Sequence, residues 1–177
     1  LMFFTSDNGA AKRFDGIHNS SGVMQGKKRS LNEGGIRVPM VVRWPGKIKA
    51  GRVSSHPWYF PDVMPTFAEI GGVSTEVPED IDGISILPTL LDKGVQKQHE
   101  YMFWQYGVRA VRSGKWKGIG KGGHLYLYDL SEDIEEKNDL SSKHPEIAAR
   151  MKKYITIGYR EPRSQKDDGK YTGKDKK

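Results

Sequence analysis

The spacing of apolar residues changes near Asp92, and this change limits the folds open to the chain. After Asp92, short apolar runs alternate with polar residues at a period close to two, and turns that contain glycine separate them. A period of two places neighbouring side chains on opposite faces of a strand, so the pattern predicts an antiparallel sheet. The expected strands are residues 101–105, 109–112, 116–119 and 125–130, and a final helix is expected at 145–155.

The part before Asp92 has the pattern of an α/β layer. The apolar run of residues 1–5 ends at Ser6-Asp7-Asn8-Gly9, which predicts a buried strand of a parallel sheet that closes in a turn. Ligands of open α/β sheets bind beyond the carboxyl ends of the strands, so Asp7 and Asn8 lie where an active site is expected. An ordinary Asn-Gly turn explains the same residues. The other expected elements are a polar loop at 10–31, a strand at 37–44 and helices at 62–70 and 85–91.

The charge and the lack of cysteine narrow the classes of function. The net charge is +7, and a basic surface attracts sulfated polysaccharides as well as nucleic acids. Because no nucleic-acid-binding motif is visible, nucleic acid is not an expected partner. No apolar run approaches the roughly 20 residues that cross a bilayer, so no membrane partner is expected either. Without cysteine, the chain contains no disulfide, no cysteine-ligated zinc and no thiol nucleophile.

Three regions are expected along the chain. Residues 1–97 form the end of an α/β domain, and residues 98–158 form the antiparallel subdomain with its helix. Residues 159–177 are rich in lysine, aspartate and glycine, which predicts a disordered basic tail. The chain opens with an apolar run at Leu1 and not with methionine, so we expect it to start inside a longer protein.

Several motifs occur in an order known from one enzyme family. The segment Phe4-Thr5-Ser6-Asp7-Asn8-Gly9 is followed by Lys28, which lies five residues before Glu33-Gly34-Gly35-Ile36-Arg37-Val38-Pro39. Further matching segments are residues 42–46, 62–67, 82–90, 110–117 and 127–130. On these residues the chain resembles the C-terminal part of the sulfatases, from residue 1 to about residue 155. It is most similar to the bacterial glycan-degrading type, near arylsulfatases and N-acetylgalactosamine-6-sulfatases.

The resemblance implies an alkaline-phosphatase-like α/β fold followed by a small antiparallel subdomain with a C-terminal helix. It also implies a Ca²⁺ ion, whose remaining ligands lie upstream, and an upstream formylglycine nucleophile. The Cys/Ser-x-Pro-x-Arg motif of that nucleophile does not occur in this sequence. We therefore expect the chain alone to be inactive, and to bind the missing N-terminal half, to self-associate through its first strand or to have a disordered N-terminus. A periplasmic or secreted bacterial location also follows from the resemblance.

The resemblance assigns roles to individual residues. Asp7 and Asn8 match the calcium ligands, and carboxylate and amide oxygens are ligands that this hard cation accepts. Lys28 matches the lysine that binds the sulfate oxygens, although a solvated charge cluster with its basic neighbours explains it as well. Glu33 and Arg37 are interpreted as structural residues that form an ion pair.

Three residues are weaker candidates for substrate binding. His18 lies in the loop between the two main motifs, where it either reaches the substrate or is solvated. Trp104 fits a tryptophan that stacks on a sugar ring, and it also fits a core tryptophan. Arg109 faces either a sulfated glycan or solvent.

The sequence thus predicts part of a sulfatase that hydrolyses sulfate esters on a carbohydrate. Two alternatives remain open. One is a phosphatase or phosphodiesterase of the same superfamily, although the Asp-Asn pair with a lysine differs from the histidine and aspartate ligands of two zinc ions. The other is a non-catalytic module that binds sulfated glycan or forms an interface.

Overall fold

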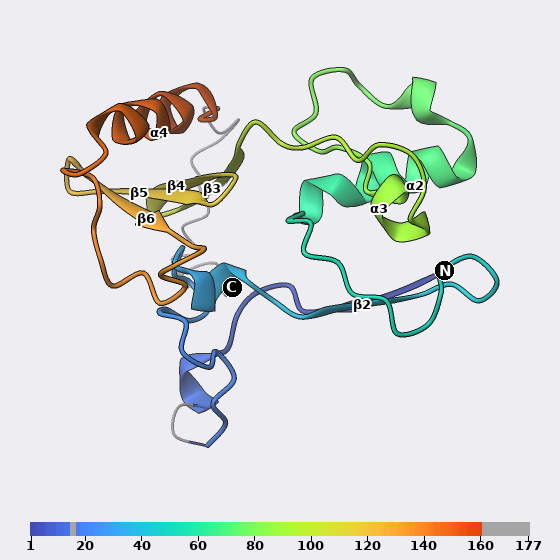
Figure 1. Cartoon of the computed structure of the whole chain (residues 1–177), viewed down its shortest axis with the longest axis horizontal. Helices are drawn as coiled ribbons and strands as arrows, with labels where there is room; N and C mark the ends of the chain where they lie inside the picture. The colour runs from blue at the N-terminus through green and yellow to red at the C-terminus, as the bar shows by residue number, and fades with distance from the viewer. Residues whose placement is uncertain (15–16, 161–177) are drawn as a thin grey trace, which may run out of the picture. The chain divides into compact units, whose positions relative to one another are not determined.

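The computed structural model describes residues 1–14 and 17–160 (Figure 1). The chain divides into two compact units, one made of Leu1–Thr5 with Pro39–Met102 and the other of Ser6–Val38 with the residues from Phe103 onward. The expected basic tail at 159–177 lies almost wholly outside the described residues. Within the described part, no helix combines the length and apolar character needed to cross a membrane.

These units differ from the expected division at residue 97. The segment Ser6–Val38 groups with the C-terminal sheet and not with the rest of the first region. The reason is a set of buried contacts that joins the segment to the sheet, and the linear order of the sequence gives no sign of it. The end of the first unit at Met102 lies close to the predicted boundary.

The first unit contains a two-stranded ladder. Strand β1 (Met2–Thr5) pairs with β2 (Met40–Arg43) in antiparallel register. The prediction of a parallel strand is therefore wrong for the one pairing that the described residues make. An apolar run indicates a strand but carries no information on its direction, and the long connection between β1 and β2 allows the chain to return antiparallel.

Short helices complete the first unit. They are the 3-10 helices η2 (Phe60–Asp62) and η3 (Ser74–Glu76) and the α-helices α2 (Val63–Gly71) and α3 (Leu87–Leu91). Helix α2 is capped at its C-terminus by Gly72, whose left-handed φ of 72° suits glycine. Both predicted helices of this region are thus present, with α3 shorter than expected.

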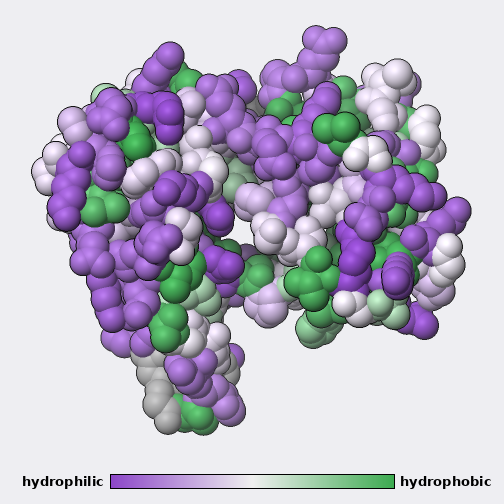
Figure 2. All heavy atoms as spheres, in the orientation of Figure 1, coloured by the Kyte–Doolittle hydropathy of each residue, from purple (hydrophilic) through white to green (hydrophobic). Residues whose placement is uncertain are grey.

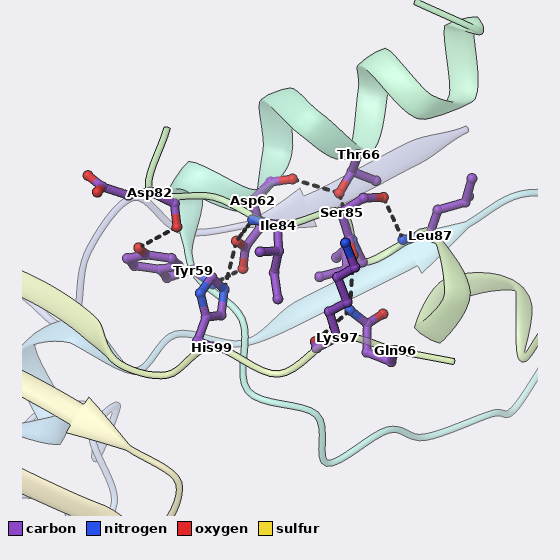
Figure 3. A network of polar contacts seen from close by, with 11 residues as sticks. Tyr59, Asp62, Thr66, Asp82, Ile84, Ser85, Leu87, Gln96, Lys97 and His99 are labelled. Atoms are coloured by element: carbon purple, nitrogen blue, oxygen red, sulfur yellow. Dashed lines mark hydrogen bonds and ion pairs between the residues drawn. The ribbon is translucent and has the colours of Figure 1, made fainter. Parts of the chain in front are cut away.

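A buried carboxylate, Asp62, ties the start of α2 to the segments around Ile84 and His99 (Figure 3). It accepts hydrogen bonds from the backbone N–H groups of Tyr59 (3.0 Å) and Ile84 (2.8 Å). His99 Nε2 lies 2.9 Å from the same carboxylate. Because Asp62 is completely buried, these partners compensate for the cost of removing its charge from water. His99 is therefore engaged in holding the first unit together.

The second unit is built on a four-stranded sheet in the order β3-β4-β5-β6. The β4–β5 and β5–β6 pairs are antiparallel, as the period of two predicted. The unit also contains η1 (Lys12–Phe14) and the short helix α1 (Glu33–Ile36). The bounds are β3 Met102–Tyr106, β4 Val108–Ser113, β5 Trp116–Lys121, β6 His124–Asp129 and α4 Pro145–Ile157.

Both faces of this sheet are covered (Figure 1). Helix α4 lies on one face, where a Cβ added to Gly118 would come within 2.9 Å of Met151 Cβ. On the other face, Leu31 packs with Ala110 and Ile119 in a buried core. The segment that carries the predicted site residues is therefore anchored directly to the sheet. Elsewhere, Figure 2 shows hydrophilic residues over most of the visible face, with separate hydrophobic patches between them.

Candidate functional site

The Asp7 turn (residues 6–10) is held against the glycine pair of the second motif. Ser6 Oγ donates a hydrogen bond to the Asn8 carbonyl oxygen at 2.8 Å, and the Gly9 N–H donates to the Gly35 carbonyl oxygen at 2.9 Å. The approach is so close that a Cβ on Gly9 would lie 1.9 Å from the Gly34 carbonyl oxygen. Glycine is therefore required on steric grounds, and Asp7 and Asn8 have a fixed backbone position.

The Lys28 loop (residues 25–33) lies beside this turn. The Lys28 N–H donates a hydrogen bond to the Ala10 carbonyl oxygen at 2.9 Å, and the Ser30 N–H closes a tight turn onto the Lys27 carbonyl oxygen at 2.8 Å. Arg29 adopts a left-handed φ of 77°, which is unfavourable for a residue with a side chain. Such strain persists where the surroundings fix the backbone, and it is common at ligand sites.

The three candidate polar groups are open to a ligand. Asp7 and Lys28 are exposed and Asn8 is half-buried. Among the residues that the structure describes, none of the three side chains forms a hydrogen bond or an ion pair. Two oxygen donors and one ammonium group, all without protein partners, are thus carried by two loops whose backbones are hydrogen-bonded to each other. This arrangement suits an anion together with a cation that prefers oxygen ligands.

The weaker candidates fall in different environments. His18 is exposed and lines a hollow of about 700 Å³, whose lining residues all come from the segment 10–27. Trp104 packs against the core below the sheet, which favours the structural interpretation of this residue. Arg109 Cζ lies 3.6 Å from the centre of the Tyr159 ring, and its Nε donates a hydrogen bond to Gln105 at 3.3 Å. His18 is therefore the one that lines a hollow next to the Lys28 loop.

A buried ion cluster (Glu33, Lys117 and Glu136) lies beneath the Lys28 loop. Lys117 Nζ is 2.7 Å from Glu33 Oε1 and 3.0 Å from Glu136 Oε1, and all three residues are at most 2% exposed. The other oxygen of Glu33 lies 3.5 Å from Arg37 Nη1, so the expected Glu33–Arg37 ion pair is present. Lys117 and Glu136 were not predicted from the sequence. The available signal was Lys117 itself, which shares the core-facing side of its strand with Ile119.

A hydrogen-bonded loop between β6 and α4 carries Glu136. Asp139 holds its end, because its Oδ1 accepts hydrogen bonds from the N–H groups of Leu127 (3.0 Å) and Ser141 (2.9 Å), and His124 Nε2 lies 2.9 Å from its Oδ2. Partial burial opposes the charge of Asp139. The hydrogen bonds outweigh this effect and lower its pKa to about 2.

Replacing Asp139 with asparagine should therefore destabilise the protein in a way that depends on pH. A depressed folded-state pKa contributes stability above the unfolded pKa of 3.8, and this contribution is lost as the pH falls toward 2. We expect a loss of about 1 kcal/mol at pH 7, kept small by solvent screening, that shrinks between pH 4 and pH 2. Urea unfolding at several pH values measures it, and Glu132→Gln on the exposed side of the same loop is the control. A loss of equal size at every pH would contradict this explanation.

The fold places the chain in the sulfatase class. More specifically, it belongs to the family described as "N-sulphoglucosamine sulphohydrolase, C-terminal", which matches residues 25–158. The chain is 40% identical over 132 residues to the mouse (Mus musculus) steryl-sulfatase, covering 67% of this chain and 21% of that protein. It is 31% identical over 186 residues to the N-acetylgalactosamine-6-O-sulfatase of Bacteroides thetaiotaomicron, covering 88% of this chain and 35% of that protein.

Solved structures agree with this assignment. One, from work on the metabolism of multiple glycosaminoglycans by Bacteroides thetaiotaomicron, superposes with a TM-score of 0.72 at 29% identity, covering 89% of this chain and 38% of that one. The alkaline-phosphatase-like fold with an antiparallel C-terminal subdomain and helix is thereby confirmed. The chain spans 21% and 35% of the length of the two curated relatives.

Membership of the sulfatase family implies a metal ion and a formylglycine in the complete enzyme. The donor set of the Asp7 turn fits the metal in part, because it offers a carboxylate and an amide oxygen without competing partners. Within residues 1–14 and 17–160, no group of three or more histidine, aspartate or glutamate side chains lies close enough to hold a metal alone.

Proposed function

We propose that the chain is the C-terminal part of a sulfatase that hydrolyses sulfate esters on a carbohydrate. The observation that supports this most is the set of open polar groups on Asp7, Asn8 and Lys28, carried by two loops that are hydrogen-bonded through Lys28 N–H and Ala10 O. A sulfate ester presents several oxygens that need neutralising charge, and its hydrolysis develops further charge on the leaving oxygen.

Each group has a distinct role in this proposal. Asp7 and Asn8 contribute oxygen ligands to Ca²⁺, and the remaining ligands and the formylglycine come from residues before Leu1. The metal supplies positive charge that polarises the sulfate group. Lys28 donates hydrogen bonds to the sulfate oxygens, and its position holds the ester in one orientation. His18, on the hollow beside the Lys28 loop, contacts the sugar.

A sulfated glycan is the substrate class that we favour. The relative from Bacteroides thetaiotaomicron is named for a 6-O-sulfated amino sugar, and its match extends over 88% of this chain. The net charge of +7 also favours a polyanionic substrate through long-range attraction. A periplasmic or extracellular location in a bacterium is part of the same proposal.

A sulfate-release assay with calcium titration tests the metal role. Asp7→Ala in the full-length enzyme should raise the calcium concentration for half-maximal activity by about tenfold or more, because one charged ligand is lost. It should also reduce the increase in melting temperature that calcium produces. Asp80→Ala, an exposed aspartate in the other unit, is the matched control and should titrate normally. Unchanged calcium dependence in Asp7→Ala would show that this residue is not a ligand.

A further inference from the structure

The buried ion cluster has a composition that the sheet core itself does not require. Lys117 is completely buried in β5, and burial of an ammonium group is costly unless the group is fully paired. An apolar residue of similar size would fill the same space without this cost. The charged side chain therefore has a role other than filling the core.

The buried ion cluster contacts the Lys28 loop at one position before Lys28 and at one position after it. On the C-terminal side, Glu33 is bound through its side chain to Lys117, and its backbone N–H donates a 2.7 Å hydrogen bond to Glu136 Oε2. On the N-terminal side, Gln25 Nε2 donates a 3.2 Å hydrogen bond to the Glu136 carbonyl oxygen. The loop leaves the cluster at Gln25, passes through Lys28 and returns at Glu33.

The backbone of Glu136 is itself strained to make these contacts. Its φ is 53°, in the left-handed region that a residue with a side chain enters only at an energetic cost. A glutamate keeps this conformation only where its surroundings determine it. Here the side chain of Glu136 faces Lys117 and Glu33 while its carbonyl oxygen faces Gln25.

We propose that Lys117 and Glu136 are positioning residues, through which the C-terminal sheet fixes Lys28 at the sulfate-binding site. This inference rests on the proposed role of Lys28. Charge is balanced in the arrangement, because Lys117 and Arg37 face the carboxylates of Glu33 and Glu136. The directional ionic contacts fix the position and orientation of the loop backbone at Glu33, which apolar packing would define less closely.

A double-mutant cycle in the full-length enzyme tests the proposal. Lys117→Met should lower kcat/KM about 10-fold to 100-fold, since a displacement of about 1 Å at a reacting group has effects of this size. In a Lys28→Ala background, the same substitution should cost less than about twofold, because the group being positioned is already absent. Equal losses in both backgrounds would reveal a general structural role and overturn the proposal.

Two further variants guard against loss of the fold. Lys117→Met combined with Glu136→Gln removes one charge of each sign, so the protein should fold and still show the background-dependent loss. If this balanced variant has normal kcat/KM, the proposal is wrong. Lys115→Met removes a lysine that is 52% exposed and paired with Asp129 at 2.6 Å, and it should leave kcat/KM unchanged. If Lys28→Ala alone has a normal kcat/KM, the proposed role of Lys28 is itself wrong. This arm of the cycle is separate from the test of Lys117.

Discussion

Replacing Lys28 with alanine is expected to lower the turnover of the full-length sulfatase by about 10²–10³-fold. The corresponding loss of transition-state stabilisation is about 2.7–4 kcal/mol, as for other charged or polar donors aimed at developing negative charge. The side chain of Lys28 is exposed and forms no ion pair within the described residues, so its removal should leave the fold intact. Steady-state hydrolysis of a sulfate ester measures the effect, and thermal unfolding checks the fold.

The neighbouring lysine provides the control for this experiment. Lys27 carries the same charge on the same loop, and its carbonyl oxygen accepts the turn hydrogen bond from the Ser30 N–H. It is not the lysine that lies five residues before Glu33, so the motif does not assign it to the sulfate. Lys27→Ala should therefore retain near-normal turnover. If both variants lose activity to the same extent, the sulfate contact is a general effect of positive charge and the assignment to Lys28 is wrong.

The second large effect is expected for Gly9→Ala. A methyl group at Gly9 would lie 1.9 Å from the Gly34 carbonyl oxygen and 2.9 Å from Gly35 Cα, and both are backbone atoms that cannot rotate away. The Asp7 turn must then move away from Gly34 and Gly35, and the hydrogen bond from the Gly9 N–H to the Gly35 carbonyl oxygen is lost. A shift of about 1 Å in the metal ligands should lower turnover about 100-fold or more. The steric strain of the added methyl group should cost about 1–3 kcal/mol of stability.

The matched control for Gly9 is a glycine with space around it. Gly114 lies in the β4–β5 turn with φ of 57°, and no atom is within 4 Å of a Cβ built there. Gly114→Ala should cost about 1–2 kcal/mol from the left-handed backbone alone, and it should leave turnover normal. A Gly9→Ala enzyme with normal turnover and normal calcium affinity would mean that the Asp7 turn is not held as the structure indicates.

Much of the fold was open to prediction because local periodicity determines it. The strands after Asp92 follow from alternation, since a period of two is a property of each strand by itself. Helices α2 and α4 follow from apolar residues on one face, with a proline in the first turn of each. Asp7, Asn8 and Lys28 were found through ordered motifs, and their roles remain proposals.

Strand direction and the partners of buried charges depended on tertiary structure. The apolar run of β1 has the same appearance in a parallel and an antiparallel pair, so its antiparallel pairing with β2 was not predictable from composition. Glu33 was expected to pair with Arg37, four residues away, and it does. Its closer partner is Lys117, which lies 84 residues along the chain.

The sequence by itself determined which elements form and which short motifs carry the polar groups. Tertiary structure alone decided that Ser6–Val38 joins the C-terminal sheet and that Lys117 and Glu136 meet Glu33 beneath the Lys28 loop. The physical reason is that a charged residue in a strand pattern looks solvent-exposed until its partners are known. Only the folded chain brings two carboxylates close enough to one ammonium group to make its burial stable.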